Sequence, residues 1–514
     1  MQVAFRVDES PQIGSGHFAR CLALADALRQ AGSRTRLISR HITSALGDLV
    51  KAKGHELKLL PADKSLMNGD LAYATWLGTS QESDARDTES ALAGEDWDWL
   101  VVDHYALDTR WERRLRKVAR KILAIDDLAD RIHDCDALVD QNLQLSPDRY
   151  RGLLPDNCRE LIGPRHALLR SEFRSVPKRK FGSVRRINIF FGGFDVAGVT
   201  GIALDEVSHQ LKNGIVLDVV VGIGNPRLDD IRAQCIMYGA NLYVQTSEMA
   251  QLFAAADIGI GAGGTTSWER CRVGLPTLLI AVAENQVSGC RGLENAGAGV
   301  FLGKFEDITP GAIGGALANL MSNFSARKAM SENCSILLDG RGAERVMLHM
   351  MRDEIVLRAA TPKDARRAWR WRNHPQTRQF SSESAELPWR MHRDWWYASL
   401  NSSARHLLIA SCGGIDFGVL RLDCSDDRAT VSIYLDPELS NLGLGSATLQ
   451  AGLAFAREAG GIRFLDATIL RINRRSQRSF LAAGYRQISE EVWTRPVICE
   501  GRGAHEDRRS RNRT

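Results

Sequence analysis

Residues 3–30 of the chain, VAFRVDESPQIGSGHFARCLALADALRQ, decide the fold of its first part. A β-rich run, VAFRVD, is followed by a turn punctuated by glycine and then by a helical pattern from His17 to Gln30, which Gly32 ends. The same order of strand, turn and helix recurs further along the chain. Such alternation predicts a parallel sheet with helices on both faces.

Strand-like runs continue this alternation in two blocks. Between the blocks, residues 174–186 (RSVPKRKFGSVRR) lose the apolar periodicity, and we predict an interdomain linker there. Two consecutive parallel α/β domains predict a two-lobed enzyme with its ligand between the lobes, at the carboxyl ends of the strands. The runs are TRLISR, HELKLL, WLVVD and KILAIDD in the first block, and INIFFGG, VLDVVVG, NLYVQT, DIGIGAGG and TLLIAV in the second.

A third block begins near Asp353 with EIVLRAATPKDARRAWRWRN, a strand followed by a helix that starts at Pro-Lys-Asp. The strand-like runs HLLIAS, FGVLRL, ATVSIYL and RFLDATIL follow, with a helix expected from about Gly445 to Glu458. This order predicts a separate α+β domain. The predicted domains are therefore two Rossmann-like lobes at 1–173 and 187–350, an α+β domain at 353–498, and a disordered basic tail at 499–514.

Composition and charge exclude several classes of protein. The 514 residues are 44% hydrophobic and 25% charged, with a mean hydropathy of −0.22, as in ordinary soluble proteins. No apolar run approaches the ~18 residues of a membrane helix, and Arg6 and Asp8 interrupt the region that a signal peptide keeps apolar. The net charge is only +5, and the last fourteen residues carry five Arg against two acids, so a nucleic-acid groove is not expected.

Cysteine usage indicates the compartment. Ten cysteines are scattered without a CxxC pair, which suits a reducing cytoplasm and offers no zinc site. We therefore expect a cytoplasmic protein with no metal, no nucleic-acid partner and no membrane insertion. The oligomeric state is left open.

A glycine-rich turn, residues 12–17 (QIGSGH), joins the first strand to the first helix. Glycines let the backbone approach a ligand, and free N–H groups at a helix start attract anions. His17 lies at that helix start, where a neutral imidazole can accept a proton from water. A tight turn with a capping histidine explains the same residues equally well.

A matching turn occurs in the second block. Residues 261–269 (GAGGTTSWE) follow the strand DIGI and open a helix, which suits a diphosphate, and Glu269 can accept hydrogen bonds from ribose hydroxyls. Residues 283–286 (AENQ) end the strand TLLIAV, where amide side chains can contact sugar hydroxyls or N-acetyl groups. The alternative is that these residues only form a turn and a helix cap and bind no ligand. This alternative is weaker because two such turns face one predicted cleft.

Six segments of the first two blocks carry a resemblance when taken together, namely FRVDESPQIGSGHFARCLALADAL, VVDHYALDTRWE, IDDLADRIHDCDALVDQN, FFGGFD, GAGGTTSWERC and AENQ. They resemble the UDP-2,4-diacetamido-2,4,6-trideoxy-β-L-altropyranose hydrolase family of pseudaminic acid biosynthesis. The resemblance covers roughly residues 1–350. It implies a two-lobed GT-B fold akin to MurG-type glycosyltransferases, and metal-independent hydrolysis at the anomeric carbon that releases UDP and the free sugar.

Roles for individual residues follow from this resemblance. It makes His17 the base that activates the attacking water. Asp103, His104 and Tyr105 follow the strand WLVVD and are also expected at the cleft, although a structural role at the strand end fits them as well. His166 stands where the family pattern has Tyr, so a sugar contact there is in doubt. The resemblance further implies Gly14, Ser15 and Gly16 near the diphosphate and the reacting carbon, Gly264, Thr265, Thr266 and Glu269 on UDP, and Asn285 and Gln286 on the sugar.

Residues 436–446 (DPELSNLGLGS) follow the strand ATVSIYL and open a helix. They resemble the acetyl-CoA pyrophosphate loop of GNAT-family N-acetyltransferases, where successive N–H groups at a helix start hold the anion. Ser440 replaces the usual Arg or Gln of that loop, and Phe480 stands where many members carry the tyrosine that protonates the thiolate. Tyr485, Tyr434 or a water could take that role. The resemblance implies acetyl-CoA as cosubstrate, held by Leu442, Gly443, Leu444, Gly445, Ser446, Asn473 and Ser476.

The start of the third block, WRWRNHPQTRQF, resembles the sugar-nucleotide branch of GNAT enzymes, and residues 366–372 could face UDP or form a solvated helix. The sequence thus predicts a bifunctional enzyme with a UDP-sugar and acetyl-CoA as its partners. Its third domain would acetylate the 4-amine of UDP-4-amino-4,6-dideoxy-N-acetyl-β-L-altrosamine, and its two lobes would then remove UDP. The alternatives are a GT-B glycosyltransferase with an accessory or inactive GNAT domain, and a protein that binds UDP-sugar or CoA without catalysis.

Overall fold

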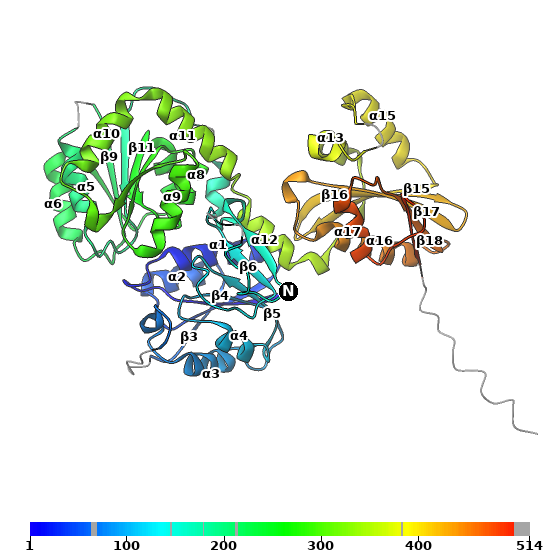
Figure 1. Cartoon of the computed structure of the whole chain (residues 1–514), viewed down its shortest axis with the longest axis horizontal. Helices are drawn as coiled ribbons and strands as arrows, with labels where there is room; N and C mark the ends of the chain where they lie inside the picture. Colours follow the sequence, from blue (N-terminus) through cyan, green and yellow to red (C-terminus); the bar gives the residue numbers. More distant parts are fainter. Residues whose placement is uncertain are drawn as a thin grey trace, which may run out of the picture. The chain divides into compact units, whose positions relative to one another are not determined.

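The computed structural model describes residues 1–62, 69–143, 146, 148–177, 179–210, 214–381 and 384–497. The chain divides into two compact units, one spanning Met1–Met347 and the other starting at Leu348. Figure 1 colours the first unit from blue to green and the second from yellow-green to red. The predicted basic tail at 499–514 lies outside the described residues.

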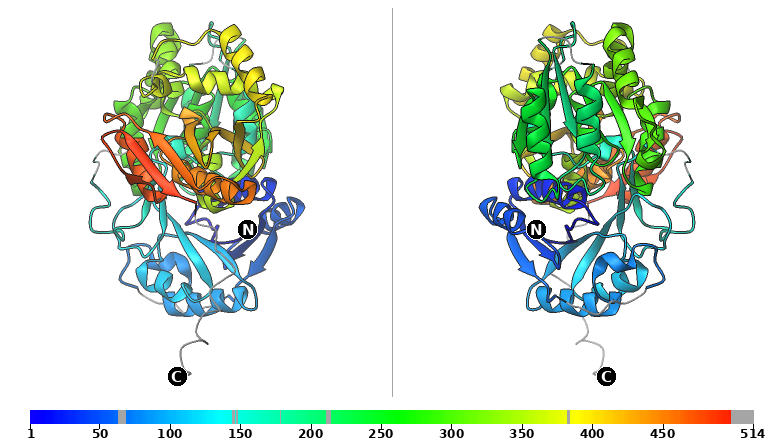
Figure 2. Two further views of the ribbon diagram at one scale, coloured as in Figure 1. Left: turned by 90° about the vertical axis from the view of Figure 1, so that its right-hand side faces the viewer. Right: turned by 90° about the vertical axis from the view of Figure 1, so that its left-hand side faces the viewer.

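The first lobe of the first unit is built on a seven-stranded parallel sheet with the order β3-β2-β1-β4-β5-β6-β7. In Figure 2 its blue and cyan strands fan out as one twisted sheet. The order reverses between β1 and β4, the topological switch point where such sheets bind ligands, and the last residues of these strands, Val7 and Asp103, are paired. The elements are β1 (Gln2–Val7), α1 (Gly16–Gln30), β2 (Arg34–Ser39), α2 (Ser44–Ala52), β3 (Glu56–Leu59), α3 (Gln81–Leu92), β4 (Trp97–Asp103), α4 (Thr109–Leu115), β5 (Ala119–Ile125), β6 (Ala137–Asp140) and β7 (Arg159–Ile162).

The second lobe repeats this plan with a six-stranded parallel sheet in the order β10-β9-β8-β11-β12-β13, which reverses between β8 and β11. Its core is formed by alternate residues of the central strands, such as Ile187, Ile189 and Ile260, packed against α5 and α10. The elements are β8 (Arg186–Phe190), α5 (Val199–Ser208), β9 (Val216–Val221), α6 (Leu228–Tyr238), β10 (Asn241–Val244), α7 (Met249–Ala255), β11 (Ile258–Ala262), α8 (Thr266–Arg272), β12 (Thr277–Ala281), α9 (Val287–Asn295), β13 (Val300–Lys304), α10 (Ala312–Ser322), α11 (Phe324–Leu337) and α12 (Gly342–Met350).

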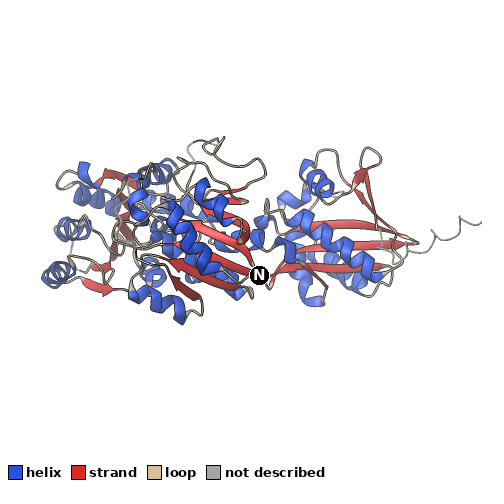
Figure 3. Cartoon of the chain, turned by 90° about the horizontal axis from the view of Figure 1, so that it is seen from below, coloured by secondary structure: helices blue, strands red, loops and turns tan. Residues whose placement is uncertain are grey.

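The second unit contains a seven-stranded mixed sheet in the order β14-β15-β16-β17-β18-β20-β19, with helices packed on it (Figure 3). Its one parallel pair among the described strands, β17 with β18, joins only Arg428–Thr430 to Phe464–Asp466. The two strands therefore separate beyond Thr430, which frees main-chain groups of β17 for a ligand. The elements are β14 (Val356–Ala359), α13 (Ala365–Asn373), α14 (Pro375–Arg378), α15 (Trp389–Leu400), β15 (Arg405–Cys412), β16 (Ile415–Ser425), β17 (Arg428–Leu435), α16 (Leu444–Ala459), β18 (Phe464–Thr468), α17 (Arg474–Ala482), β19 (Arg486–Gln487) and β20 (Val492–Pro496).

The predicted fold class is confirmed: two Rossmann-like lobes in a GT-B arrangement precede an α+β domain. The strands that the sequence analysis missed are β6, β7, β13, β19 and β20, each of five residues or fewer. Length alone does not explain this, because β3, β10 and β14 have four residues each and were predicted. Within the described residues, no helix combines the length and apolarity needed to cross a membrane.

The turn between β11 and α8 has no room for a side chain at Gly263, where a Cβ would clash with Sγ of the buried Cys290 on α9. We expect Gly263→Ala to destabilise the first unit by about 1–3 kcal/mol, as overpacking does in other cores. Thermal unfolding followed by circular dichroism measures the loss. The double variant Gly263→Ala/Cys290→Ala should recover most of it, and Gly315→Ala, where a Cβ meets nothing, is the control. An unchanged melting temperature in Gly263→Ala would contradict the packing described.

Candidate functional site

A cleft of about 620 Å³ lies between the two lobes of the first unit. Two turns of the second lobe approach the glycine-rich turn of the first lobe across it: a Cβ added at Gly16 would lie 3.1 Å from Oγ1 of Thr265, and one added at Gly193, which follows β8, would lie 3.3 Å from Oγ of Ser15. The carboxyl ends of both sheets thus open into one space. The cleft is lined by all the residues predicted for UDP and sugar in the first two blocks, namely Gly14, Ser15, Gly16, His17, Gly264, Thr265, Thr266, Glu269, Asn285 and Gln286.

His17 occupies the second position of α1 and bonds to the end of β4. Its Nδ1 lies 2.6 Å from Oδ1 of Asp103, which is buried. Burial alone would raise the pKa of Asp103, but Arg20 and then His17 hold that pKa well below its ordinary value, so the group stays a carboxylate. An anionic acceptor at Nδ1 favours the tautomer with its proton on Nδ1. Nε2 of His17 is then the nitrogen that can accept a proton in the cleft.

Arg20 connects Asp103 to a second acid at the neighbouring strand end. Its Nε and Nη2 donate to the two oxygens of Asp103 at 2.6 and 2.7 Å. Its Nη1 donates to both oxygens of Asp127, which follows β5, at 2.8 and 2.7 Å. A buried guanidinium bonded to both carboxylates fixes the position of α1 against the sheet.

Tyr105 extends this network toward the second lobe. Its hydroxyl donates to Oδ2 of Asp127 at 2.9 Å, and its ring meets the edge of His17 with a centroid distance of 4.6 Å. Across the cleft, Nδ2 of Asn285 donates to the same hydroxyl at 3.4 Å. Burial, and next Asp127, raise the pKa of Tyr105 well above its ordinary value, so it remains a hydrogen-bond donor.

The second lobe presents the turn between β11 and α8. Oγ1 of Thr265 accepts from Nε2 of Gln141 at 3.5 Å, which is a second bond between the lobes. Oε1 of Glu269 accepts from Nε of Arg170 at 3.0 Å, so Oε2 is the oxygen that a ligand hydroxyl could approach. Burial raises the pKa of Glu269, and Arg170 opposes that rise. Oε1 of Gln286 accepts from the main-chain N–H of Val282 at 3.1 Å, which leaves its amide group for a ligand.

Several cleft residues were missed by the sequence analysis. Arg20 could have been found, because it lies one helical turn after His17 on the same face of α1. Asp127 follows β5 as Asp103 follows β4, and adjacent parallel strands end at the same edge. Arg170 and Gln141 carry no local signal, since they reach the cleft from irregular segments. Across the described residues, no three His, Cys, Asp or Glu side chains gather as a metal site would require.

In the second unit, the predicted CoA loop leads into α16. Gly443 caps this helix with a positive φ of 80°, a conformation that favours glycine. Leu442 and Leu444 are each 1% exposed, so both residues are buried and neither side chain is placed to contact a ligand. Gly445 packs against α17, because a Cβ there would lie 3.2 Å from Oγ of Ser479, and Oγ of Ser446 donates to the carbonyl of Gly443 at 3.0 Å.

The other predicted CoA residues cap the start of α17. Oδ1 of Asn473 accepts from the main-chain N–H of Ser476 at 3.0 Å, so the side-chain NH₂ of Asn473 is the group left for a ligand. Phe480 is buried in the core and meets Tyr485 edge to face at 4.8 Å. Burial raises the pKa of both Tyr485 and Tyr434.

Comparison with known proteins agrees with this division of the chain. The profile of the acetyltransferase (GNAT) domain family matches residues 354–486. The chain is 24% identical over 254 residues to the UDP-2,4-diacetamido-2,4,6-trideoxy-beta-L-altropyranose hydrolase of Campylobacter jejuni, covering 49% of this chain and 81% of that protein. It is 21% identical over 516 residues to an uncharacterized protein of Methanocaldococcus jannaschii, covering 95% and 97%. It is 25% identical over 206 residues to the spore coat polysaccharide biosynthesis protein SpsG of Bacillus subtilis, covering 38% and 60%.

Parts of the chain are also similar to solved structures. MurG of Acinetobacter baumannii is 15% identical and superposes with a TM-score of 0.45 over 67% of this chain and 98% of its own. An aminoglycoside acetyltransferase in complex with coenzyme A is 13% identical, with a TM-score of 0.26 over 28% of this chain and 94% of its own. From its sheets and its family match, the chain is a two-lobed protein of the GT-B type fused to a GNAT acetyltransferase domain.

The bond between His17 and Asp103 predicts which nitrogen of the imidazole carries a proton. In ¹⁵N-labelled protein, we expect a proton on Nδ1 of His17, as seen in long-range ¹H–¹⁵N spectra. Asp103→Asn should shift these signals, whereas Asp26→Asn, which alters the separate pair of Asp26 with His55, should leave them unchanged. A His17 that carries its proton on Nε2 would contradict the geometry.

Proposed function

We propose that the first unit hydrolyses a UDP-sugar at the anomeric carbon, with UDP-2,4-diacetamido-2,4,6-trideoxy-β-L-altropyranose as its substrate. The observation that carries this proposal is the pairing of His17 with Asp103 in a cleft whose facing wall is the glycine- and threonine-rich turn after β11. The similarity to the Campylobacter jejuni hydrolase over half of the chain supports the choice of substrate.

The proposed mechanism needs only a positioned water, a base and a stabilised leaving group. Nε2 of His17 removes a proton from water, and the water oxygen forms a bond to C1 of the sugar. The bond from C1 to the β-phosphate oxygen breaks, and its electron pair leaves with UDP. Main-chain N–H groups of the turns at residues 15–16 and 264–266 meet the charge of the diphosphate, and Glu269 accepts from a ribose hydroxyl. Asp103 stabilises the imidazolium that forms.

We further propose that the second unit transfers the acetyl group of acetyl-CoA to the 4-amine of UDP-4-amino-4,6-dideoxy-N-acetyl-β-L-altrosamine. The GNAT match and the separation of β17 from β18 next to the start of α16 support this assignment. The neutral amine attacks the thioester carbon, and the C–S bond breaks to give the amide and CoA. The product would be the substrate of the first unit, so one chain would carry two consecutive steps of pseudaminic acid biosynthesis. A cytoplasmic location remains a prediction.

The hydrolase proposal is tested by following UDP release by NMR from the proposed substrate. The wild type should release UDP in the presence of EDTA, and His17→Ala should lower kcat by about 10²–10⁴-fold, the usual contribution of a general base. His209→Ala, at an exposed histidine outside the cleft, is the matched control. Turnover that survives in His17→Ala would discard His17 as the base. Release of UDP only when a second sugar is added would favour the glycosyltransferase alternative.

The acetyltransferase proposal is tested at the start of α16 with Ser446→Glu. The new carboxylate suits a helix N-terminus but repels the CoA diphosphate, so the KM for acetyl-CoA should rise about tenfold while the fold is kept. Release of free CoA with the UDP-4-amino sugar is followed with a thiol reagent. Ser446→Gln is the neutral control, and UDP release by the first unit should be unchanged in both variants. An unaltered KM in Ser446→Glu would remove this helix start from the proposed CoA site.

A further inference from the structure

One wall of the cleft is aromatic and ends at the proposed base. The rings of Tyr73 and Trp76 lie 4.5 Å apart, centroid to centroid, and they lie 5.2 and 5.8 Å from the ring of Tyr105. The Tyr105 ring in turn meets His17. All four side chains line the cleft. The cleft therefore offers a ligand an extended aromatic surface directly beside the group that would activate water.

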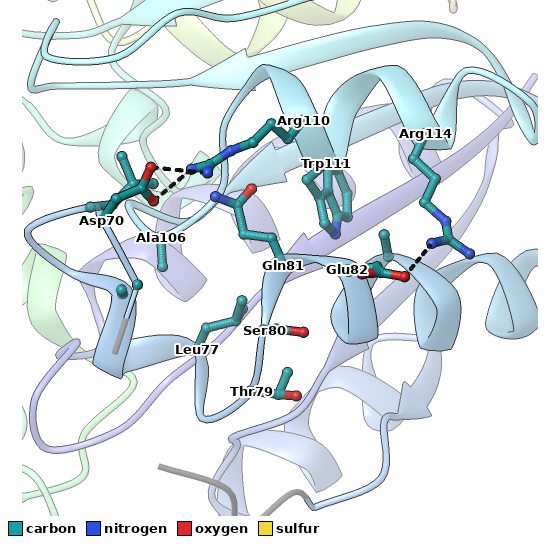
Figure 4. Close-up of a pocket in the computed structure, with 14 residues that line it drawn as sticks. Asp70, Leu77, Thr79, Ser80, Gln81, Glu82, Ala106, Arg110, Trp111 and Arg114 are labelled. Atoms are coloured by element: carbon teal, nitrogen blue, oxygen red, sulfur yellow. Dashed lines mark hydrogen bonds and ion pairs between the residues drawn. The ribbon is translucent and has the colours of Figure 1, made fainter. Parts of the chain in front are cut away.

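The segment that carries Tyr73 and Trp76 has a second hollow behind it. A cavity of about 380 Å³ lies on its other side, lined by Leu71, Ala74 and Leu77 of the segment and by Trp111 of α4. Figure 4 shows this cavity and the ion pair that ties the segment to α4, in which Arg110 donates to both oxygens of Asp70 at 3.0 and 2.8 Å. Tyr73 and Trp76 are partly exposed on the cleft side. A segment with a hollow on each side has no hydrophobic core for large aromatic side chains to fill. The presence of Tyr73 and Trp76 on this segment therefore points to a ligand.

We propose that Tyr73 and Trp76 form a stacking platform for the apolar face of the sugar ring and make the first unit selective for a deoxy sugar. This inference rests on the proposed function of the same cleft. Aromatic faces pack favourably against C–H groups and a methyl substituent. A sugar with a hydroxyl at C6 would bring that hydroxyl against the rings, where it loses its bonds to water.

The platform acts on binding and selection rather than on the proton transfer. Burial raises the pKa of Tyr73, so its hydroxyl stays protonated, and the indole of Trp76 is only a donor. On the opposite wall, the side chains of Asn285 and Gln286 are placed for the polar substituents of the sugar. One face of the sugar would thus meet aromatic carbon while the other meets amide groups.

The test compares two substrates in the full chain: UDP-2,4-diacetamido-2,4,6-trideoxy-β-L-altropyranose and the analogue of this UDP-sugar that carries a hydroxyl at C6. Trp76→Ala and Tyr73→Ala should each raise the KM for the deoxy sugar about tenfold, change kcat less than about threefold, and reduce the preference for the deoxy sugar by a similar factor. The dissociation constant of UDP alone, measured by calorimetry, should not change. Trp76→Phe should restore most of the preference. Thr75→Ala is the matched control, because Thr75 is exposed on the same segment and lines neither hollow.

The outcomes separate this inference from the proposed hydrolysis. Folded alanine variants that keep the wild-type KM and preference would overturn the platform while the hydrolase stands. If the wild type releases no UDP, the proposed hydrolysis is rejected. The stacking platform is then tested by calorimetry, which measures the dissociation constant of the intact deoxy UDP-sugar. The platform is supported if the wild type binds that UDP-sugar more tightly than UDP and Trp76→Leu loses this difference. It is overturned if the wild type binds the two equally. Circular dichroism shows whether an alanine variant is misfolded. In that case, Trp76→Phe and Trp76→Leu are compared with each other instead.

Discussion

The first unit depends on one buried carboxylate. Asp103 ends β4, accepts two hydrogen bonds from Arg20 and binds Nδ1 of His17, with almost no access to water. Removing one partner of such a buried ion pair usually costs about 3–5 kcal/mol, because the remaining charge loses its compensation. The pKa of Asp103 lies below its value in an unfolded chain, so its contribution to stability is present above that unfolded value and is lost as the pH falls further.

This carboxylate places α1, and α1 places the first turn of the cleft. The second lobe brings its own turn opposite, and the bonds between them, Asn285 to Tyr105 and Gln141 to Thr265, are long at 3.4 and 3.5 Å. Bonds of this length are weak, but the lobes are also joined by the ion pair of Arg170 with Glu269 at 2.9 Å and by a hydrophobic cluster that includes Leu169 and Trp268. The cleft thus combines an imidazole held in place by Asp103 with contacts from both lobes along its opening.

Local sequence patterns predicted much of the fold and part of the site. The alternation of strands and helices, the glycine turns before α1 and α8, and the position of His17 are local properties, and the structure shows each of them. The bond between His17 and Asp103 is not local, since it requires β4 to lie beside β1 in the register that pairs Val7 with Asp103. Neither Arg170 nor Gln141 belongs to a periodic segment, so their approach to the cleft depends on tertiary structure. The spacing of residues in the predicted CoA loop also did not reveal that Leu442 and Leu444 are buried, because leucine occurs both at helix starts and in hydrophobic cores.

The account stands on the claim that Asp103 keeps His17 ready as a base. The most direct measurement is the rate of UDP release from the proposed substrate by wild type and by Asp103→Asn at saturating substrate. The variant keeps the shape of the side chain but removes its charge, so kcat should fall at least about 100-fold. A folded Asp103→Asn enzyme with a rate within about threefold of the wild type would contradict the account.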